Sequence, residues 1–268
     1  MRYQLLAYWY TLFHLAEQTG MPTMRPMWVE FADDAKTWAM DKQFMAGPHL
    51  LVAPVFTRGA TSVGAYFPAG RWYDVDDGTV YDGPKEATLA APITKVPVFQ
   101  RGGSVLPRQM RLRRSSAQML HDPYTLVVAP DASGAAAEGA LYLDEGDGYA
   151  YRDAAAYHLR KFTYSAGTLA SSASHAAPDW TPPNTLERVE VLGVAEPKRV
   201  SLTHKGATRD LTFHMAADRN RRAAPDPPLA SPRALPRSLA RRARAGSSSA
   251  SPTSRWPTTG RSRCTRLL

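Results

Sequence analysis

The sequence predicts a mainly β protein that begins with a helical or α/β segment and ends in a disordered basic tail. Apolar residues first recur with helical spacing over residues 2–19. An apolar run then follows the helix-breaking Gly47 and Pro48, and short strand-like runs alternate with turns to about residue 215. Beyond Met215 no valine, isoleucine, phenylalanine or tyrosine occurs. These observations place a join between the helical start and the β-rich body near residues 43–55.

Residues 2–19 are predicted to form a helix. Large apolar side chains lie three and four positions apart along it, at Leu5, Tyr8, Trp9, Leu12, Phe13 and Ala16. Gly20 and Pro22 end the helix. The aromatic stripe could form a ligand surface, but we favour its packing as a buried helix face.

Residues 24–30 are predicted to form a short extended segment. Its proline disfavours a central antiparallel strand and suits the end of a parallel one. Asp33 and Asp34 then precede a short predicted helix over residues 35–46. Paired carboxylates can be acid and base catalysts, but we interpret these as helix caps because nothing nearby indicates a pocket. The unbroken apolar run at residues 50–53 is typical of a strand buried on both faces.

Residues 50–121 predict an antiparallel β-sandwich, because short strands alternate with turn signals. The strands are expected at residues 64–68, 71–75, 79–81 and 104–107, with turns at 69–70, 76–78, 82–84 and 101–103. Pro92 and Pro97 confine residues 91–100 to a sheet edge. Three aromatic side chains could stack on sugar rings, but packing inside a small β domain is the interpretation favoured for Trp72, Tyr73 and Tyr81.

A second sandwich is predicted after it, with strands at residues 124–129, 140–143, 157–164, 188–192, 199–204 and 211–213 and loops at 132–139 and 176–184. The acidic loop 144–148 lacks the ligand spacing of a calcium loop and predicts a hairpin turn. A basic cluster precedes this region, at Arg108, Arg111, Arg113 and Arg114. It could grip phosphate, but it lacks interleaved aromatic residues, so a solvated strand or an interdomain salt-bridge site is favoured.

The excess positive charge lies entirely in residues 216–268, which hold twelve arginines, no lysine and two aspartates. The other 21 basic residues nearly balance 22 acidic ones, so the body lacks the charge of a nucleic-acid binder. The tail could be a basic arm for nucleic acid or an anionic membrane, a plain disordered tail, or out-of-frame translation. We favour the third hypothesis, because arginine without lysine is the bias of GC-rich sequence read in an arbitrary frame.

Other features exclude further classes of site. No apolar run approaches the length of a membrane span, and no secretory leader is recognised at the start. The single cysteine, Cys264, lies in the tail, which excludes disulfides and cysteine metal sites from the body. No cofactor is predicted.

Several motifs resemble the C-terminal part of the glycoside hydrolase family 31 α-glucosidases. They run in order over roughly residues 2–215, at residues 2–6, 8–13, 24–28, 43–55, 72–74 and 97–103. Within that family, residues 107–116 and 122–126 look most like the catalytic α subunit of the members that trim glucose from N-linked glycans. Residues 141–146 fit the family's strand and turn, with Glu145 where a second aspartate is more usual, while Lys42 departs from the usual Asp-Asp-Gln.

The resemblance implies four regions. Residues 1–48 would be the end of a (β/α)8 barrel, 49–122 a proximal β-sandwich, 123–215 a distal β-sandwich and 216–268 the disordered tail. The family is a retaining one, in which one aspartate attacks the anomeric carbon and a second acts as acid and then base. Both lie upstream in family sequences and map onto no residue here. We therefore predict no catalytic, substrate-binding, cofactor-binding or metal residue, and the chain as given is expected to be inactive.

The resemblance further implies an exo-acting α-glucosidase of the endoplasmic reticulum lumen, which acts on N-linked glycans together with a non-catalytic β subunit. Two other classes rank below it: a non-catalytic β-sandwich module that binds carbohydrate or protein, and a nucleic-acid binder acting through the tail. By the same resemblance, the first forty-odd residues should expose apolar surface and be prone to aggregate, because most of the barrel is missing.

Overall fold

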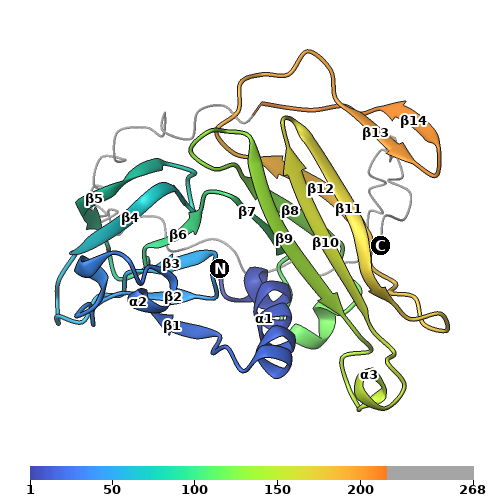
Figure 1. Ribbon diagram of the computed structural model, residues 1–268, viewed down its shortest axis with the longest axis horizontal. Coiled ribbons are helices and arrows are strands. Elements are labelled where there is room, and N and C mark those ends of the chain that lie inside the picture. Colours follow the sequence, from blue (N-terminus) through green and yellow to red (C-terminus); the bar gives the residue numbers. More distant parts are fainter. Residues whose placement is uncertain (216–268) are drawn as a thin grey trace, which may run out of the picture. The chain divides into compact units, whose positions relative to one another are not determined.

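The computed structural model describes residues 1–215, which form two six-stranded sheets, a two-stranded ribbon and a few helices (Figure 1). The prediction of a mainly β protein is confirmed. The predictions for the tail and for Cys264 lie outside the described residues. None of the helices in the described part is long and apolar enough to cross a membrane.

The predicted N-terminal helix is confirmed. A 3-10 turn, η1 (Tyr3–Leu5), leads into α1 (Leu6–Thr19). The helix ends at Gly20, which adopts a left-handed conformation with φ 73° and donates its N–H to the carbonyl of Ala16. One face of this helix is buried and includes the predicted Leu5, Tyr8 and Leu12, but Phe13, which was expected on it, is 57% exposed.

The segment after α1 differs from its prediction. It consists of β1 (Met24–Pro26), the single turn α2 (Met27–Glu30), the 3-10 turn η2 (Ala35–Thr37), β2 (Phe44–Ala46) and β3 (Leu50–Val52). The extended segment therefore stops at Pro26, and β1 pairs antiparallel with β2 rather than ending a parallel strand. The helix predicted over residues 35–46 is wrong beyond its first turn. Pairing of β2 between β1 and β3 overrides the local helix preference of this stretch.

The first sheet is completed by β4 (Ser62–Asp74), β5 (Val80–Ala90) and β6 (Val98–Arg101), in the order β1-β2-β3-β6-β4-β5. The turn at residues 76–78 is confirmed, but those at 69–70 and 82–84 are wrong, because both lie inside the long β4–β5 ladder. At residues 69–70 the chain does not turn back; the register of the ladder shifts there instead, between Phe67 and Gly70. The predicted edge position of residues 91–100 is also wrong. Both prolines precede β6, which therefore pairs on its two sides with β3 and β4.

The second sheet has the order β11-β10-β9-β7-β8-β12. Its strands are β7 (Ser104–Arg108), β8 (Tyr124–Ala129), β9 (Ala136–Leu143), β10 (His158–Ser165), β11 (Thr168–Ala176) and β12 (Leu186–Val191). Short helical turns, η3 (Ser116–Met119) and α3 (Ala150–Asp153), lie in its connections. Most pairs of this sheet are antiparallel, but β12 runs parallel to β8 and β7 runs parallel to β9.

Three predictions in this region need correction. The loop expected at residues 132–139 is shorter, because β9 already begins at Ala136. The loop at residues 144–148 is not a tight hairpin turn, because α3 lies between it and β10. The predicted strand at 211–213 is displaced: the ribbon is made by β13 (Ser201–His204) and β14 (Ala207–Asp210). In addition, β11 has no counterpart among the predicted strands.

Helix α1 lies between the two large sheets (Figure 1). Leu5, Tyr8 and Leu12 pack against residues of β2, β3, β6 and β7, and Ala7 joins the core of the second sheet. Its Thr11 hydroxyl accepts the backbone N–H of Tyr142 in β9 at 3.0 Å. The core of the first sheet is separate and contains Met27, Phe67, Trp72 and Phe99. The helix therefore joins two sheets that otherwise have their own cores.

Candidate functional site

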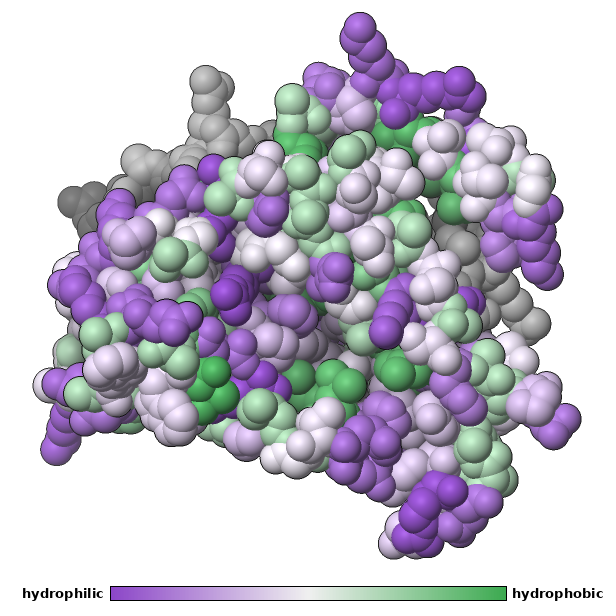
Figure 2. Space-filling view, viewed as in Figure 1, coloured by the Kyte–Doolittle hydropathy of each residue, from purple (hydrophilic) through white to green (hydrophobic). Residues whose placement is uncertain are grey.

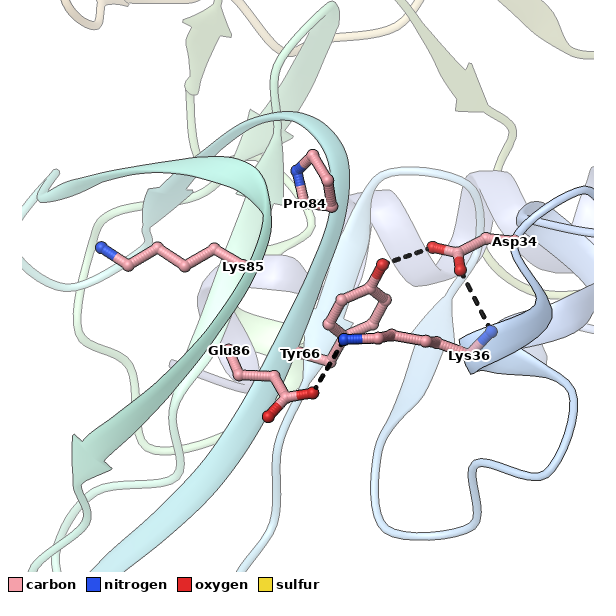
Figure 3. Close-up of a pocket in the computed structure, with 6 residues that line it drawn as sticks. All are labelled: Asp34, Lys36, Tyr66, Pro84, Lys85 and Glu86. Atoms are coloured by element: carbon pink, nitrogen blue, oxygen red, sulfur yellow. Dashed lines mark hydrogen bonds and ion pairs between the residues drawn. The ribbon is translucent and has the colours of Figure 1, made fainter.

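A hollow of about 450 Å³ opens beside β4 and β5 (Figure 3). Three segments that are distant in the sequence supply its lining: Asp34 and Lys36 from around η2, Tyr66 from β4, and Pro84, Lys85 and Glu86 from β5. Two carboxylates and two ammonium groups balance, so the hollow carries no net charge. Polar and charged side chains from these three segments converge on it, which makes it a candidate binding site.

Asp34 holds one side of this polar hollow together. One carboxylate oxygen accepts the backbone N–H of Lys36 at 3.1 Å, as the helix-cap interpretation predicts. The other accepts the hydroxyl of Tyr66 at 2.6 Å. Burial of the hydroxyl, together with this carboxylate, raises the pKa of Tyr66 to about 12. Tyr66 is therefore a hydrogen-bond donor at neutral pH and cannot act as a base.

An ion pair crosses the mouth of the polar hollow. The ammonium of Lys36 lies 3.1 Å from a carboxylate oxygen of Glu86 and 5.1 Å from the centroid of the Tyr66 ring. Both charged side chains are largely exposed, so this pair adds little to stability. The side chain of Lys85 extends away from it (Figure 3).

The backbone of Tyr66 is fixed by a residue that was not predicted to have this role. The side-chain amide of Gln43 accepts the Tyr66 N–H and donates to the Tyr66 carbonyl, each at 2.8 Å. Gln43 is buried and thus substitutes for a neighbouring strand beside β4. With these bonds the hollow is preformed, but both oxygens of Asp34 are occupied, and the arrangement offers binding groups rather than a poised acid and base.

A smaller hollow of about 220 Å³ is lined by Trp28, Ala32 and Trp38. The indole N–H of Trp38 donates to the Ala32 carbonyl at 2.7 Å. The two hollows share the segment around η2, since residues 32–38 contribute to both. Sequence reasoning missed both sites. The one signal in the sequence was the pair of tryptophans on either side of a short loop, because the polar lining runs from Asp34 to Glu86, 52 positions apart.

The aromatic residues considered for sugar stacking are packing residues, as predicted. Trp72 and Tyr73 are completely buried, and each donates to a backbone carbonyl, of Pro68 at 3.0 Å and of Pro130 at 2.9 Å. Tyr81 is partly buried and stacks on Phe67 with ring centroids 4.7 Å apart.

Two arginines of the cluster, Arg111 and Arg113, make ion pairs, as the salt-bridge interpretation predicts. Arg111 contacts Glu187 at 2.9 Å, and Arg113 binds both carboxylate oxygens of Asp122 at 2.8 and 2.5 Å. The Arg113 guanidinium lowers the pKa of Asp122 below its ordinary value. Arg108 is buried and donates to the side chain of Gln4 at 2.8 Å. These arginines tie the loop after β7 to its surroundings.

The acidic loop after β9 also has structural partners. The carboxylate of Asp144 accepts the hydroxyls of Tyr10, at 2.8 Å, and Tyr142, at 2.9 Å. It also accepts the backbone N–H of Gly146. Within residues 1–215, no group of three or more histidine, cysteine, aspartate or glutamate side chains could hold a metal ion.

Comparison with known proteins agrees with the resemblance. Residues 20–106 match the family model "Glycosyl hydrolase family 31 C-terminal domain". The chain is 41% identical over 208 residues to Neutral alpha-glucosidase AB of Mus musculus. The aligned stretch covers 77% of this chain and 22% of that protein.

Solved structures show the same likeness. A crystal structure of glucosidase II alpha subunit bound to Glc1Man2 is similar with a TM-score of 0.73 and 33% identity over 78% of this chain and 24% of that one. The heterodimeric complex of the ER glucosidase II catalytic subunit with the binding domain of its regulatory subunit is similar with a TM-score of 0.72. The identity is 34%, over 78% of this chain and 24% of that one. The chain thus spans about a quarter of the length of these relatives. These matches identify the C-terminal region of glycoside hydrolase family 31 in this chain.

Proposed function

We propose that this chain is the C-terminal region of a retaining exo-α-glucosidase that removes terminal α-linked glucose from N-linked glycans. The observation that carries the proposal is the 41% identity over 208 residues with Neutral alpha-glucosidase AB. The Glc1Man2-bound structure of a similar protein supports a glucosylated glycan as substrate. In this role the described residues support a catalytic site and do not form one.

The proposed division of labour follows the four regions above. Residues 1–48 would close a catalytic (β/α)8 barrel, and residues 49–122 and 123–215 would be the two sandwiches behind it, with β7 of the first range pairing in the sheet of the second. Exposed apolar side chains in the first region support this division: Phe13 is 57% exposed and Met24 is 54% exposed. Exposed apolar surface of this kind suits contact with further protein.

Hydrolysis with retention needs two carboxyl groups about 5–5.5 Å apart, one as nucleophile and one as acid and base. We assign neither role to a residue of this chain. Asp34, the acidic residue most enclosed by the polar hollow, is held by Tyr66 and by the backbone of Lys36. The chain by itself is therefore expected to show no α-glucosidase turnover.

The complex of a catalytic subunit with the binding domain of a regulatory subunit supports a second part of the proposal. We infer a non-catalytic regulatory subunit as partner and the endoplasmic reticulum lumen as compartment. Co-sedimentation of this chain with that binding domain would locate the contact in the C-terminal region. Co-sedimentation of the domain only with the upstream part of the catalytic subunit would exclude it.

The test of the proposed function is a chimera. Residues 1–215 replace the corresponding segment of mouse Neutral alpha-glucosidase AB, and hydrolysis of a chromogenic α-glucoside is measured. We expect activity within about tenfold of the parent, because the exchanged segment supplies packing and no reacting group. The isolated chain, assayed in parallel, should show none.

A variant of the chimera provides the control. Gly139 in β9 lies so close to the backbone of Val105 that any side chain would collide with it. Gly139→Val in the chimera should therefore abolish folding and activity together. A chimera that folds, by circular dichroism and thermal melting, yet has no activity would refute the proposed function.

A further inference from the structure

The segment that follows β7 is the longest exposed stretch of the described chain. Residues 111–118 are all exposed, and no other uninterrupted exposed run within residues 1–215 is as long. Near its start, Leu112 is 99% exposed. Proteinases cut folded proteins at exposed loops, because cleavage elsewhere requires local unfolding first. The segment is therefore accessible to an enzyme that acts on the chain itself.

The backbone of this segment is available for binding. Residues 109–115 belong to no helix or strand, and within the described part of the chain residues 110–113 form no backbone hydrogen bond. The N–H of Arg114 donates only to the side chain of Gln118, at 3.3 Å. Extended peptides are bound through backbone hydrogen bonds, so a proteinase can engage this segment without unfolding β7 or η3.

Arginine side chains single out one peptide bond in the segment, the bond between Arg114 and Ser115. The guanidinium of Arg114 forms no ion pair or hydrogen bond within residues 1–215. A proteinase with a carboxylate in its primary specificity pocket binds the arginine directly before the bond that it hydrolyses. Arg114 is free to enter such a pocket.

Two further arginines lie close to this bond. Arg113 and Arg111, the second and fourth residues before it, pair with Asp122 and Glu187. Of these arginine side chains 37% and 50% are exposed, and ion pairs at the surface contribute little to stability. Acidic side chains of a proteinase can therefore compete for both guanidinium groups. The segment thus suits an enzyme that recognises several arginines in one short stretch.

We propose that the bond between Arg114 and Ser115 is a processing site, hydrolysed by an arginine-specific endoproteinase while the chain is folded. One water molecule is consumed. Its hydroxyl adds to the carbonyl carbon of Arg114, which becomes a carboxylate, and the nitrogen of Ser115 takes up protons as a new amino terminus. The inference does not rest on the proposed function, because it involves no group that reacts in sugar hydrolysis.

The fold should hold the two products together. β7 belongs to the first product, whereas its neighbours β8 and β9 belong to the second. Every residue of β7 is buried, and Val105 lies in the core of the second sheet. In addition, the Thr11 hydroxyl of α1 accepts the N–H of Tyr142 in β9. Cleavage is therefore expected to give a two-chain form rather than two separate fragments.

The test is limited proteolysis of the full chain with trypsin, and mass spectrometry identifies each bond that is cut. Within residues 1–215 we expect the Arg114–Ser115 bond to be cut first, at least about tenfold faster than any other bond. Cuts after residue 215 are scored separately, because they leave residues 1–215 whole. Size-exclusion chromatography should show both products in one peak that separates only in urea.

Substitutions distinguish recognition from general exposure. Arg114→Gln should slow cutting at this bond by at least about a hundredfold, with an unchanged circular dichroism spectrum, because the charge that the pocket binds is lost. Arg58→Gln is the matched control: Arg58 is exposed, but it lies in a turn closed by the bond from the Ala60 N–H to the Thr57 carbonyl, and the rate should not change.

A second enzyme, a subtilisin-type proteinase selective for paired arginines, tests the neighbouring side chains. It should cut the same bond, and Arg111→Gln should slow this enzyme but not trypsin. Earlier cutting at another bond of residues 1–215 overturns the inference. So does a bond that stays intact in the folded chain and is cut only in urea. Products that separate without urea would overturn the two-chain form.

Discussion

The residue allowed at position 47 is restricted both by the turn between β2 and β3 and by the packing of α1. Gly47 forms this turn with φ 57°, and a side chain there would meet the Tyr8 hydroxyl and the Leu12 side chain of α1. The Tyr8 hydroxyl cannot move freely, because it donates to the Ala46 carbonyl at 2.8 Å. We predict that Gly47→Ala lowers the free energy of unfolding by roughly 2–4 kcal/mol, measured by urea denaturation.

Gly59→Ala is the matched control for this prediction. Gly59 has a similar backbone, φ 76°, but nothing lies within 4 Å of its missing side chain. The control should therefore show only the backbone strain, about 1 kcal/mol. Equal losses in the two variants would mean that the contact with α1 does not contribute.

A second prediction concerns Gln43, which replaces a strand beside Tyr66. Gln43→Leu would leave the buried N–H and carbonyl of Tyr66 without partners. An unsatisfied buried polar group costs about 1–3 kcal/mol, so the loss in unfolding free energy should be roughly 2–5 kcal/mol. The Tyr66–Asp34 bond should loosen as well, and the pKa of Tyr66, measured by its ultraviolet absorbance, should fall toward its ordinary value.

Gln118→Leu serves for comparison. Gln118 is exposed and accepts only the Arg114 N–H, at 3.3 Å. Its replacement should change stability by less than about 0.5 kcal/mol. If Gln43→Leu were equally mild, Gln43 would not be the residue that positions Tyr66.

At the scale of elements, α1 has two apolar faces. One is buried between the sheets, and the other presents Leu6, Tyr10 and Phe13 at the surface, each at least 37% exposed. Figure 2 shows hydrophobic surface over the region where Figure 1 places α1. The predicted exposure of apolar surface in the first forty-odd residues is thereby confirmed.

This second face leads to a prediction about association. Leu6→Lys combined with Phe13→Gln should suppress concentration-dependent aggregation of the chain, because both changes remove exposed apolar surface from α1. Static light scattering across a range of concentrations measures it. Phe56→Gln, an exposed aromatic change far along the chain, should have a much smaller effect. Aggregation that persists unchanged in the double variant would place its origin elsewhere.

For the whole molecule, two histidines near α1 link stability to pH. Burial, followed by the charges of Arg101 and Arg25, lowers the pKa of His49 from 6.5 to about 4. Burial also lowers the pKa of His14, which stacks on Tyr142 at 4.0 Å and has an unpartnered ring nitrogen. Above about pH 6.5 both rings are neutral whether the chain is folded or unfolded.

As pH falls below 6.5 the unfolded chain takes up these protons first, so stability is lost. For His49 the loss extends down to about pH 4 and amounts to roughly 3 kcal/mol. We predict that urea midpoints fall between pH 6.5 and pH 4, and that His49→Gln flattens this dependence. His121→Gln, at an exposed position, should leave the slope unaltered. An identical slope in His49→Gln would exclude His49 as its source.

Sequence patterns predicted much of this fold, because buried positions are marked by apolar residues at regular spacing along the chain. Helix α1 and the buried strands β3 and β8 follow directly from apolar spacing. The helix expected over residues 35–46 failed because β2 is set by its neighbours in the sheet, which no local pattern contains. Likewise β11 is rich in serine and alanine and has little apolar alternation.

The candidate sites were less accessible to sequence reasoning. Asp34 was correctly interpreted as a cap, but its contact with Tyr66 depends on the fold bringing η2 against β4. Trp28 and Trp38 form one hollow only because the loop between them doubles back through Thr37. The spacing of these residues in the sequence predicts neither the Asp34–Tyr66 contact nor the hollow between the two tryptophans.

The passage from β6 to β7 also bears on how such chains exchange parts during evolution. β6 is an inner strand of the first sheet, and β7, two residues later, is an inner strand of the second. The segment that matches the family model, residues 20–106, ends within β7. Recombination at that boundary would insert most of one parent's central strand into the other parent's sheet. The two sheets are therefore expected to be inherited together, with crossovers tolerated outside this passage.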